Sequence, residues 1–117
     1  MVKASIPGTA SLSTGEIWLI NLDPTVGSEI QKTRPCVVIS PPEMLRHLRT
    51  VLVAPMTTGS RPAGFRIPVS FNGKEGLILL DQLRTVDRQR LVHKMGMLPD
   101  EARLHTLRTL QAMFEPA

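Results

Sequence analysis

Two short polar segments of the chain carry the side chains best suited to chemistry. Residues 23–35 contain Glu29 and Arg34 between two apolar stretches, and residues 57–60, which begin with Thr57, follow a third apolar stretch. A glutamate can accept a proton, an arginine can stabilise charge on a phosphoryl group, and a threonine can position an oxygen. This set suits transesterification of RNA, in which the ribose 2′-OH attacks its own phosphate. DNA would resist it because DNA lacks that hydroxyl.

The same residues also have ordinary structural explanations. Glu29 and Arg34 can form a surface ion pair that contributes little to stability. Residues 57–60 can be simple turn residues, and Asp81, which follows another apolar stretch, can cap a turn. Spacing alone leaves the chemical and the structural interpretations open.

Other chemistries find little support in the sequence. His47, His93 and His105 are scattered and Cys36 is the single cysteine, so neither a metal-ligand cluster nor an intrachain disulfide is predicted. A Walker loop, a dinucleotide fingerprint and a nucleophile elbow are all missing from the sequence. We therefore expect no metal and no cofactor.

Composition limits the class of protein and of partner. The 117 residues fit one domain, and the 42% of hydrophobic residues predict a packed core. Aromatic residues make up only 3%, which weighs against a surface of exposed rings for stacking nucleic-acid bases. A formal charge of +4 and a pI of about 10.0 favour a polyanion or an acidic protein as partner, although an inert basic surface would look the same.

The ends of the chain and its compartment can also be predicted. Residues 1–14 are small and polar and are expected to form a flexible tail, followed by a single domain over residues 15–117. No apolar stretch approaches the length that spans a membrane. With Cys36 in an apolar stretch and no signal peptide, we expect a cytoplasmic protein.

Short strands and one terminal helix are expected to position the polar segments. The helix begins at Pro99, and a helical turn or loop covers residues 43–49. Asn72-Gly73 predicts a tight hairpin turn, and residues 81–87 read as mixed polar chain. Strands are predicted over residues 16–22, 36–40, 50–55, 65–69, 76–80 and 93–98. The pattern indicates a mainly β (α+β) protein built on a small, strongly curved sheet or barrel.

Four ordered blocks of sequence carry a resemblance that covers about residues 15 to 114. The first contains Gly15-Glu16-Ile17-Trp18 and Leu22-Asp23-Pro24-Thr25-Val26-Gly27-Ser28-Glu29, and the second is Thr33-Arg34-Pro35-Cys36-Val37-Val38-Ile39-Ser40. The third and fourth are Ala54-Pro55-Met56-Thr57-Thr58 and Leu80-Asp81-Gln82-Leu83-Arg84-Thr85-Val86-Asp87. Together they resemble the MazF/PemK/Kid family of toxins from toxin–antitoxin pairs.

The resemblance implies a fold, an activity and partners. The fold would be an SH3-like β-barrel with a C-terminal helix, working as a homodimer. The activity would be that of a metal-independent, sequence-specific endoribonuclease that leaves a 2′,3′-cyclic phosphate and a 5′-hydroxyl on single-stranded RNA. The protein partner would be an antitoxin, often acidic and flexible at its C-terminus, that covers the RNA groove at the dimer interface.

The resemblance also assigns residues by motif position. Arg34 matches the catalytic Arg before Pro, Thr57 matches the catalytic Thr, and Glu29 matches a Glu with catalytic or RNA-contacting roles in some members. Asp81 matches the catalytic Asp of the Kid branch, but that branch has an Arg where this chain has Leu79. The Kid-type Arg–Asp pair is thus expected to be absent, and Asp81 is expected to hold Arg84 or a loop. The predicted RNA-binding residues are Thr58, Gln31, Lys32, Arg61, Asp81 and Arg84.

Two further functions remain open at this stage. A CcdB-type toxin has the same fold but inhibits DNA gyrase by binding protein, and it needs no catalytic Arg–Thr pair. A non-catalytic barrel that binds RNA or peptide would leave RNA whole. Sequence-specific recognition is expected to reside in residues 26–33 and 59–64, with Gln31 and Arg61 as base-reading candidates.

Overall fold

The computed structural model describes residues 12–117. The predicted tail therefore lies, over residues 1–11, outside the described residues. Leu12 packs against core residues, and the Thr14 hydroxyl donates a hydrogen bond to the Ser40 carbonyl at 2.6 Å. The described chain thus contacts the sheet from its first residues.

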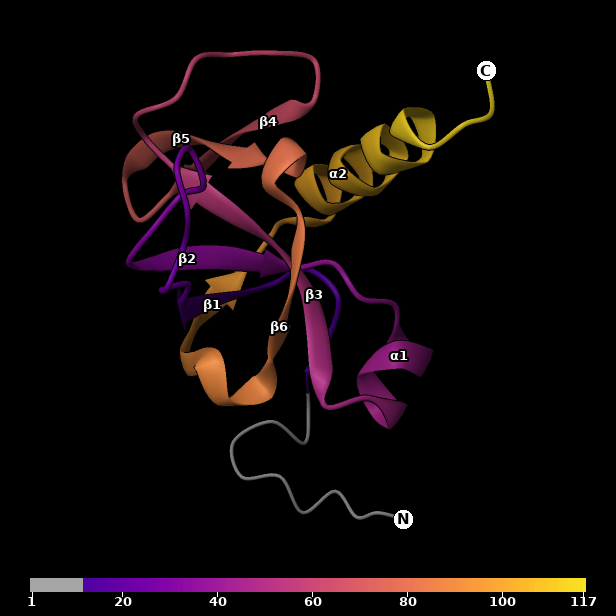
Figure 1. Ribbon diagram of the computed structural model, residues 1–117. Helices are drawn as coiled ribbons and strands as arrows, with labels where there is room; N and C mark the ends of the chain where they lie inside the picture. Colours follow the sequence, from indigo (N-terminus) through magenta and orange to yellow (C-terminus); the bar gives the residue numbers. More distant parts are fainter. Residues whose placement is uncertain (1–11) are drawn as a thin grey trace.

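Within residues 12–117 the chain forms a mainly antiparallel β fold with a helix at its C-terminal end (Figure 1). The strands are β1 (Glu16–Asn21), β2 (Thr33–Val38), β3 (Thr50–Thr57), β4 (Arg66–Phe71), β5 (Lys74–Leu79), β6 (Arg84–Asp87) and β7 (Leu91–Met97). The helices are α1 (Pro42–His47) and α2 (Asp100–Met113), with single 3-10 turns at η1 (Leu80–Gln82) and η2 (Arg88–Arg90).

The sheet curls into a half-barrel, which confirms the predicted fold class. Its order is β4-β5-β3-β2-β1-β7, and β6 pairs with the first half of β3, while the second half of β3 pairs with β5. A strand that changes partner halfway forces the sheet to bend around it. Helix α2 packs beside the β4–β5 part of the sheet in Figure 1 and buries Leu110 there.

The bent sheet has apolar residues on both faces. Along β3, Ala54 and Met56 belong to one core cluster, whereas Val51 and Val53 belong to the other. Neighbouring residues of a strand point to opposite faces, so a strand buried on both sides reads as a continuous apolar run. This explains why β3 was predicted from composition although its residues do not alternate with polar ones.

Most elements differ by a few residues from the sequence-based prediction, and three differences have a clear physical reason. Strand β2 begins at Thr33 rather than Cys36 and includes Pro35, which is tolerated because β3 begins to pair with β2 only at Cys36. Strand β6 lies inside the segment predicted as mixed polar chain. Pro99 immediately precedes α2 as its N-cap instead of forming the first helical residue.

Candidate active site

Arg34 reaches the site from the beginning of β2. Its side chain is half-buried, and its Nε donates a hydrogen bond to the Gln31 carbonyl at 3.1 Å. Within residues 12–117 no carboxylate pairs with this guanidinium, and its terminal nitrogens make no hydrogen bond. The structural interpretation as an ion pair with Glu29 is therefore wrong, and the terminal nitrogens are available for a ligand.

Thr57 ends β3 and presents a hydroxyl group. Its Oγ1 accepts a hydrogen bond from the Gly59 N–H at 3.2 Å, so the hydroxyl proton is left to be donated elsewhere. Gly76 on β5 lies against the backbone of Thr57: a Cβ added there would lie 2.8 Å from the Thr57 carbonyl oxygen. The close approach of β3 and β5 thus depends on a glycine.

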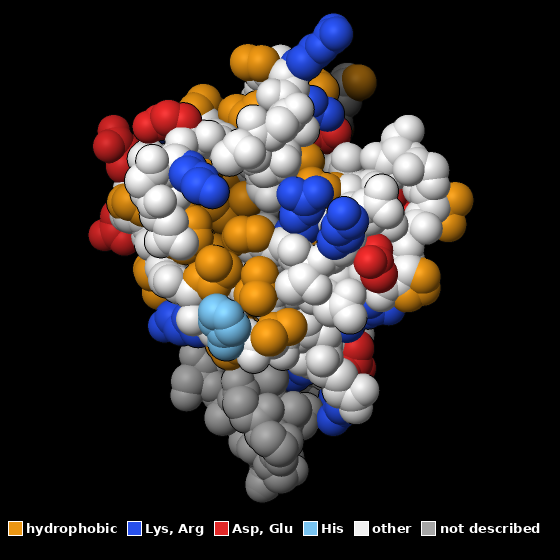
Figure 2. Space-filling model, turned by 90° about the vertical axis from the view of Figure 1, so that its left-hand side faces the viewer, with side chains coloured by type: hydrophobic (Ala, Val, Ile, Leu, Met, Phe, Trp, Pro, Cys, Tyr) orange, Lys and Arg blue, Asp and Glu red, His pale blue; other side chains and the backbone are white. Residues whose placement is uncertain are grey.

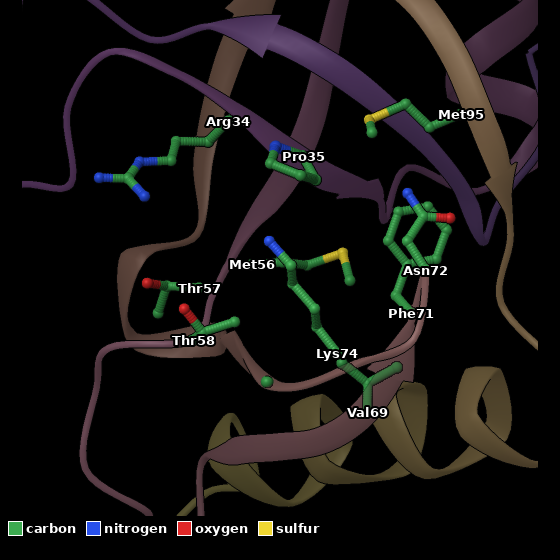
Figure 3. A pocket seen from close by; sticks show the side chains of 11 residues that line it. Arg34, Pro35, Met56, Thr57, Thr58, Val69, Phe71, Asn72, Lys74 and Met95 are labelled. Atoms are coloured by element: carbon green, nitrogen blue, oxygen red, sulfur yellow. The ribbon is translucent and has the colours of Figure 1, made fainter.

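Arg34, Thr57 and Thr58 meet at one cavity, which we call the active-site cavity. Its volume is about 310 Å³. On this side of the molecule, hydrophobic side chains gather between Lys and Arg side chains (Figure 2). In Figure 3 the Arg34 guanidinium and the hydroxyls of both threonines lie on the same side of the cavity. The lining residues are Arg34, Pro35, Met56, Thr57, Thr58, Val69, Phe71, Asn72, Lys74, Gly76 and Met95.

Glu29 lies at a second, more polar cavity, which we call the loop cavity. Its carboxylate Oε1 accepts a hydrogen bond from the Val26 N–H at 2.7 Å and so stabilises the turn of residues 26–29. The loop cavity has a volume of about 560 Å³ and lies between the β1–β2 loop and η1. Its lining residues are Pro24, Ser28, Glu29, Ile30, Asp81, Gln82, Leu83 and Arg84.

Asp81 pairs with Arg66 rather than with Arg84. Arg66 Nε donates to Asp81 Oδ1 at 3.0 Å and Nη2 donates to Oδ2 at 2.8 Å, a two-pronged ion pair. The hydrogen bond from Arg66 lowers the pKa of the Asp81 carboxyl below its ordinary value. Of the two contacts expected for Asp81, with Arg84 or with a loop, the one with Arg84 is wrong, because β4, paired with β5, places Arg66 opposite Leu79, next to Asp81.

Arg84 instead supports the end of β1. Its Nη1 donates a hydrogen bond to the Leu22 carbonyl at 3.1 Å. Burial raises the pKa of the Cys36 thiol to about 12, and the nearby charge of Arg84 opposes this only in part. Cys36 is thus a neutral core residue, as predicted, and no nucleophile.

The remaining predicted RNA-binding residues lie on exposed loops. Gln31, Lys32 and Arg61 are exposed and line neither cavity. Lys32 has a left-handed backbone with φ 71°, and its N–H donates to Asp23 Oδ1 at 2.8 Å. These residues flank the cavities without forming their walls.

Sequence reasoning missed two side chains that line the cavities, Lys74 and Gln82, and it also missed Arg66, the partner of Asp81. Lys74 lies in the active-site cavity, directly after the Asn72-Gly73 turn. Gln82 accepts from the Ile30 N–H at 2.7 Å and donates to the Ser28 carbonyl at 3.4 Å. The sequence marked the positions of Lys74 and Gln82, by the hairpin turn and by the fourth block, but gave no sign of what they contact.

Two properties of residues 12–117 bear on other classes of function. No group of three or more His, Cys, Asp or Glu side chains there is placed to hold a metal ion. In the same residues, neither helix has the length and apolar character needed to cross a membrane.

Comparison with known proteins identifies relatives in sequence. The profile of a family described as PemK-like, MazF-like toxin of type II toxin-antitoxin system matches residues 13–114. Endoribonuclease PemK of Escherichia coli is 40% identical over 83 residues, which cover 67% of this chain and 62% of PemK, so the match spans less than two thirds of that relative. Endoribonuclease EndoA of Bacillus subtilis is 36% identical over 93 residues, which cover 74% of this chain and 80% of EndoA.

Solved structures with low sequence identity share the fold. MazF of Deinococcus radiodurans superposes with a TM-score of 0.76 at 22% identity, covering 87% of this chain and 94% of that one. An endoribonuclease in complex with its cognate antitoxin, from a mycobacterial species, gives a TM-score of 0.75 at 16% identity, covering 92% and 99%. Because the family profile extends over nearly all the described residues, the chain belongs to the PemK-like, MazF-like toxins of type II toxin–antitoxin systems.

Proposed function

We propose that this chain is the toxin of a type II toxin–antitoxin pair and that it acts as an endoribonuclease on single-stranded RNA at the active-site cavity. The observation that carries the proposal is a guanidinium and a hydroxyl, from Arg34 and Thr57, that line one open cavity without a carboxylate in its lining. Such a cavity suits the negative charge of a phosphodiester. Family membership, and relatives named as endoribonucleases, support the same function.

The reaction is attack of a ribose 2′-OH on the adjacent phosphorus. The new P–O2′ bond forms as the P–O5′ bond breaks, and the 2′-OH gives up its proton. The leaving O5′ takes up a proton from solvent water, so the products are a 2′,3′-cyclic phosphate and a 5′-hydroxyl. The free terminal nitrogens of Arg34 stabilise the charge that grows on the non-bridging oxygens. The Thr57 hydroxyl donates a hydrogen bond to one of these oxygens, since its Oγ1 already accepts one from the Gly59 N–H. Neither role needs a metal ion.

Glu29 is the proposed acceptor of the 2′-OH proton. One carboxylate oxygen holds the Val26 N–H, which fixes the side chain, and the other has no hydrogen bond in the described residues. Because Glu29 lines the loop cavity rather than the active-site cavity, its share in catalysis is secondary to that of Arg34 and Thr57. Asp81 is committed to Arg66 and has no proposed proton-transfer role.

Sequence recognition is assigned to the exposed loops around the two cavities. Gln31 and Lys32 on the β1–β2 loop and Arg61 on the β3–β4 loop are exposed and can contact bases or phosphates. Thr58 lines the active-site cavity, and Arg84 lines the loop cavity. RNA that crosses from one cavity to the other would contact all of these elements.

The proposal includes two protein partners, an antitoxin and a second copy of the chain. The proposed place of action is the cytoplasm. The acidic, flexible segment of an antitoxin covers the basic active-site face, and one structural relative is an endoribonuclease solved with its cognate antitoxin. A second copy of the chain docks at β7, whose outer edge is unpaired in the described residues and carries exposed Val92. Sedimentation equilibrium tests this docking: a monomer at micromolar concentration would contradict it.

The test of the proposed function is cleavage of a long RNA in the presence of EDTA. Wild-type protein is expected to cut it and to leave 5′-hydroxyl ends, which accept a labelled phosphate from polynucleotide kinase without phosphatase treatment. A substrate with 2′-deoxyribose at the mapped position should stay whole. Arg34→Ala is expected to lower kcat by roughly 100-fold or more, because it removes the main charge stabilisation.

Thr57 offers a matched pair of variants. Thr57→Val keeps the shape and removes the hydroxyl, and it is expected to lower kcat by roughly tenfold or more, whereas Thr57→Ser keeps the hydroxyl and most of the activity. Unaltered circular dichroism and Tm in each variant exclude unfolding as the cause. Full cleavage by both Arg34→Ala and Thr57→Val would contradict the assignment, and inhibition of gyrase without RNA cleavage would replace it with the CcdB-type function.

A further inference from the structure

The active-site cavity has a second half that the proposed chemistry does not use. Arg34 and Thr57 occupy one side, whereas Met56, Phe71 and Met95 form an apolar wall on the other (Figure 3). Met56 is buried and the other two side chains are half-buried. A nucleotide matches these two halves, because it has a charged phosphate at one end and a base with flat apolar faces at the other.

Lys74 places a second positive charge at this cavity. Its side chain is exposed, and in Figure 3 it extends from the β4–β5 hairpin toward Pro35, so that its ammonium group lies between the Arg34 side and the Phe71 side. No ion pair holds Lys74 within residues 12–117. The ammonium group is therefore available for an anion, as the Arg34 guanidinium is.

Lys74 and Phe71 form one rigid unit. They face each other directly across the β4–β5 ladder, so both side chains stand on the same face of the hairpin. The turn between them consists of Asn72 and Gly73, whose φ angles of 53° and 74° fit a two-residue hairpin turn. So tight a turn leaves the pair little freedom to move apart.

The Phe71 ring is also fixed from behind. A Cβ added to Gly96 on β7 would lie 3.2 Å from the ring atom Cε1, so the ring lies directly against the β7 backbone. Phe71 also lines the active-site cavity. A single aromatic side chain held in this way can stack a base even in a chain that is poor in aromatic residues.

We propose that this half of the cavity is a nucleotide subsite: the base of a nucleotide that adjoins the cleaved bond inserts beside Phe71, and Lys74 binds its phosphate. The inference rests on the proposed function and adds a specificity pocket to it. Asn72 at the rim supplies an amide that can hydrogen-bond a base edge.

Lys74 is tested by RNA binding at several salt concentrations. The probe is an RNA with 2′-deoxyribose at the mapped cleavage position, which binds without being cut. Lys74→Ala is expected to weaken binding about tenfold and to reduce the slope of log affinity against log salt by about 0.7, the value for one phosphate contact on a single strand. Lys74→Arg should restore both. Arg46→Ala, which removes a charge from α1 outside the cavity lining, should change neither.

The base pocket is tested with abasic RNAs. Uncleavable RNAs that lack the base at successive positions are compared for binding, and one position next to the cleaved bond is expected to lose affinity roughly tenfold. Phe71→Leu should weaken binding of intact RNA to a similar extent and lose the sensitivity to that abasic position. Met95→Ala enlarges the pocket from β7 and leaves the hairpin unaltered. It should also weaken binding of intact RNA and lose the sensitivity to that abasic position.

The outcomes separate the two proposals. Wild-type protein that leaves every RNA whole contradicts the proposed function. If wild-type protein cuts RNA but Lys74→Ala binds RNA as wild type does, the subsite is overturned and the proposed function stands. The same holds if Phe71→Leu and the abasic position weaken RNA binding independently of each other.

Discussion

The two sides of the active site are built by different means. The β4–β5 hairpin is a ladder with register from Arg66–Leu79 to Phe71–Lys74, closed by a tight turn. The β1–β2 loop, residues 22–32, has no ladder of its own, and side chains from distant parts of the chain hold it. Those side chains are Gln82, which binds both Ile30 and Ser28, Arg84, which binds Leu22, and Arg90, which binds Asn21 and Asp23.

This difference indicates which part of the site has a fixed geometry and which part can vary. Backbone ladders fix the positions of Thr57, Lys74 and Phe71, and any change there disturbs the sheet itself. A loop held by a few side chains can change sequence and shape while the sheet stays intact. The proposed nucleotide subsite on the hairpin side therefore has a fixed geometry, and the loop side is where the proposed selectivity among RNA sequences or antitoxins can vary.

Gly76→Ala should lower both stability and activity more than Gln82→Met or Asp81→Asn, because it acts on the hairpin side, where backbone ladders fix the positions. The added Cβ would meet the Thr57 carbonyl oxygen at 2.8 Å, and a backbone atom in a ladder cannot swing away. We expect a loss of about 1–3 kcal/mol in the free energy of unfolding and a fall in kcat of up to roughly 100-fold as Thr57 is displaced. Urea unfolding and cleavage of a defined RNA measure the two effects.

Gly64→Ala is the matched control for this substitution. No atom lies within 4 Å of a Cβ added at Gly64, and its φ is outside the left-handed region. Its free energy of unfolding should stay within about 0.5 kcal/mol of wild type. Wild-type cleavage by Gly76→Ala would show that the β3–β5 contact does not fix Thr57.

The same contrast explains what could be predicted from the sequence. Long apolar runs such as β3 were found because burial on both faces leaves a strong signal. Strand β6 was missed because only Val86 of its four residues is buried, and its pairing with β3 is a tertiary contact. The fold class followed from the number of short strands and the terminal helix, which local patterns do report.

The site was only partly predictable for the same reason. Motif resemblance marked Arg34 and Thr57, but their shared cavity depends on how β2 and β3 pair. Asp81 was given the wrong partner because Arg84 is close in sequence, whereas Arg66 is brought near only by the register of β4 and β5. Lys74 gave no chemical signal at all, since a lysine after a turn is usually a solvated charge.

Gln82→Met should lower stability and activity to an intermediate extent, and it should increase the mobility of the loop side only. Methionine has a similar length but leaves the Ile30 N–H and the Ser28 carbonyl without their side-chain partner. We expect a loss of about 1 kcal/mol in stability, and roughly tenfold lower kcat/KM because the loop that orients Arg34 through Gln31 becomes less ordered. Amide hydrogen exchange should accelerate in residues 26–31 and not in β4 or β5.

Gln89→Met serves as the control, because the exposed Gln89 side chain makes no hydrogen bond in the described residues. It should leave exchange and cleavage as in wild type. Equal acceleration of exchange in the loop and in the hairpin of Gln82→Met would show that the two sides open as one cooperative unit and are not stabilised separately.

Asp81→Asn should change stability least. It removes the ion pair that connects the hairpin side to the loop side. Arg66 begins the hairpin, and Asp81 lies beside Gln82 in η1, so their ion pair connects the ladder to the residue that holds the loop. Because the hydrogen bond from Arg66 lowers the folded-state pKa of Asp81, the pair stabilises the fold above the ordinary aspartate pKa of about 3.9. That contribution is lost as the pH falls through the lowered pKa.

Thermal unfolding of wild type and Asp81→Asn across this pH range measures the contribution. The Tm of the variant should be slightly lower at pH 7, and the difference should shrink as the pH falls below the ordinary aspartate pKa, since the wild-type carboxyl then becomes protonated as well. Glu75→Gln removes one negative charge from the hairpin without breaking an ion pair in the described residues, and its Tm difference should not follow this pH course. A Tm difference for Asp81→Asn that persists unchanged to low pH would mean that the shape of the side chain, and not its charge, joins the two sides.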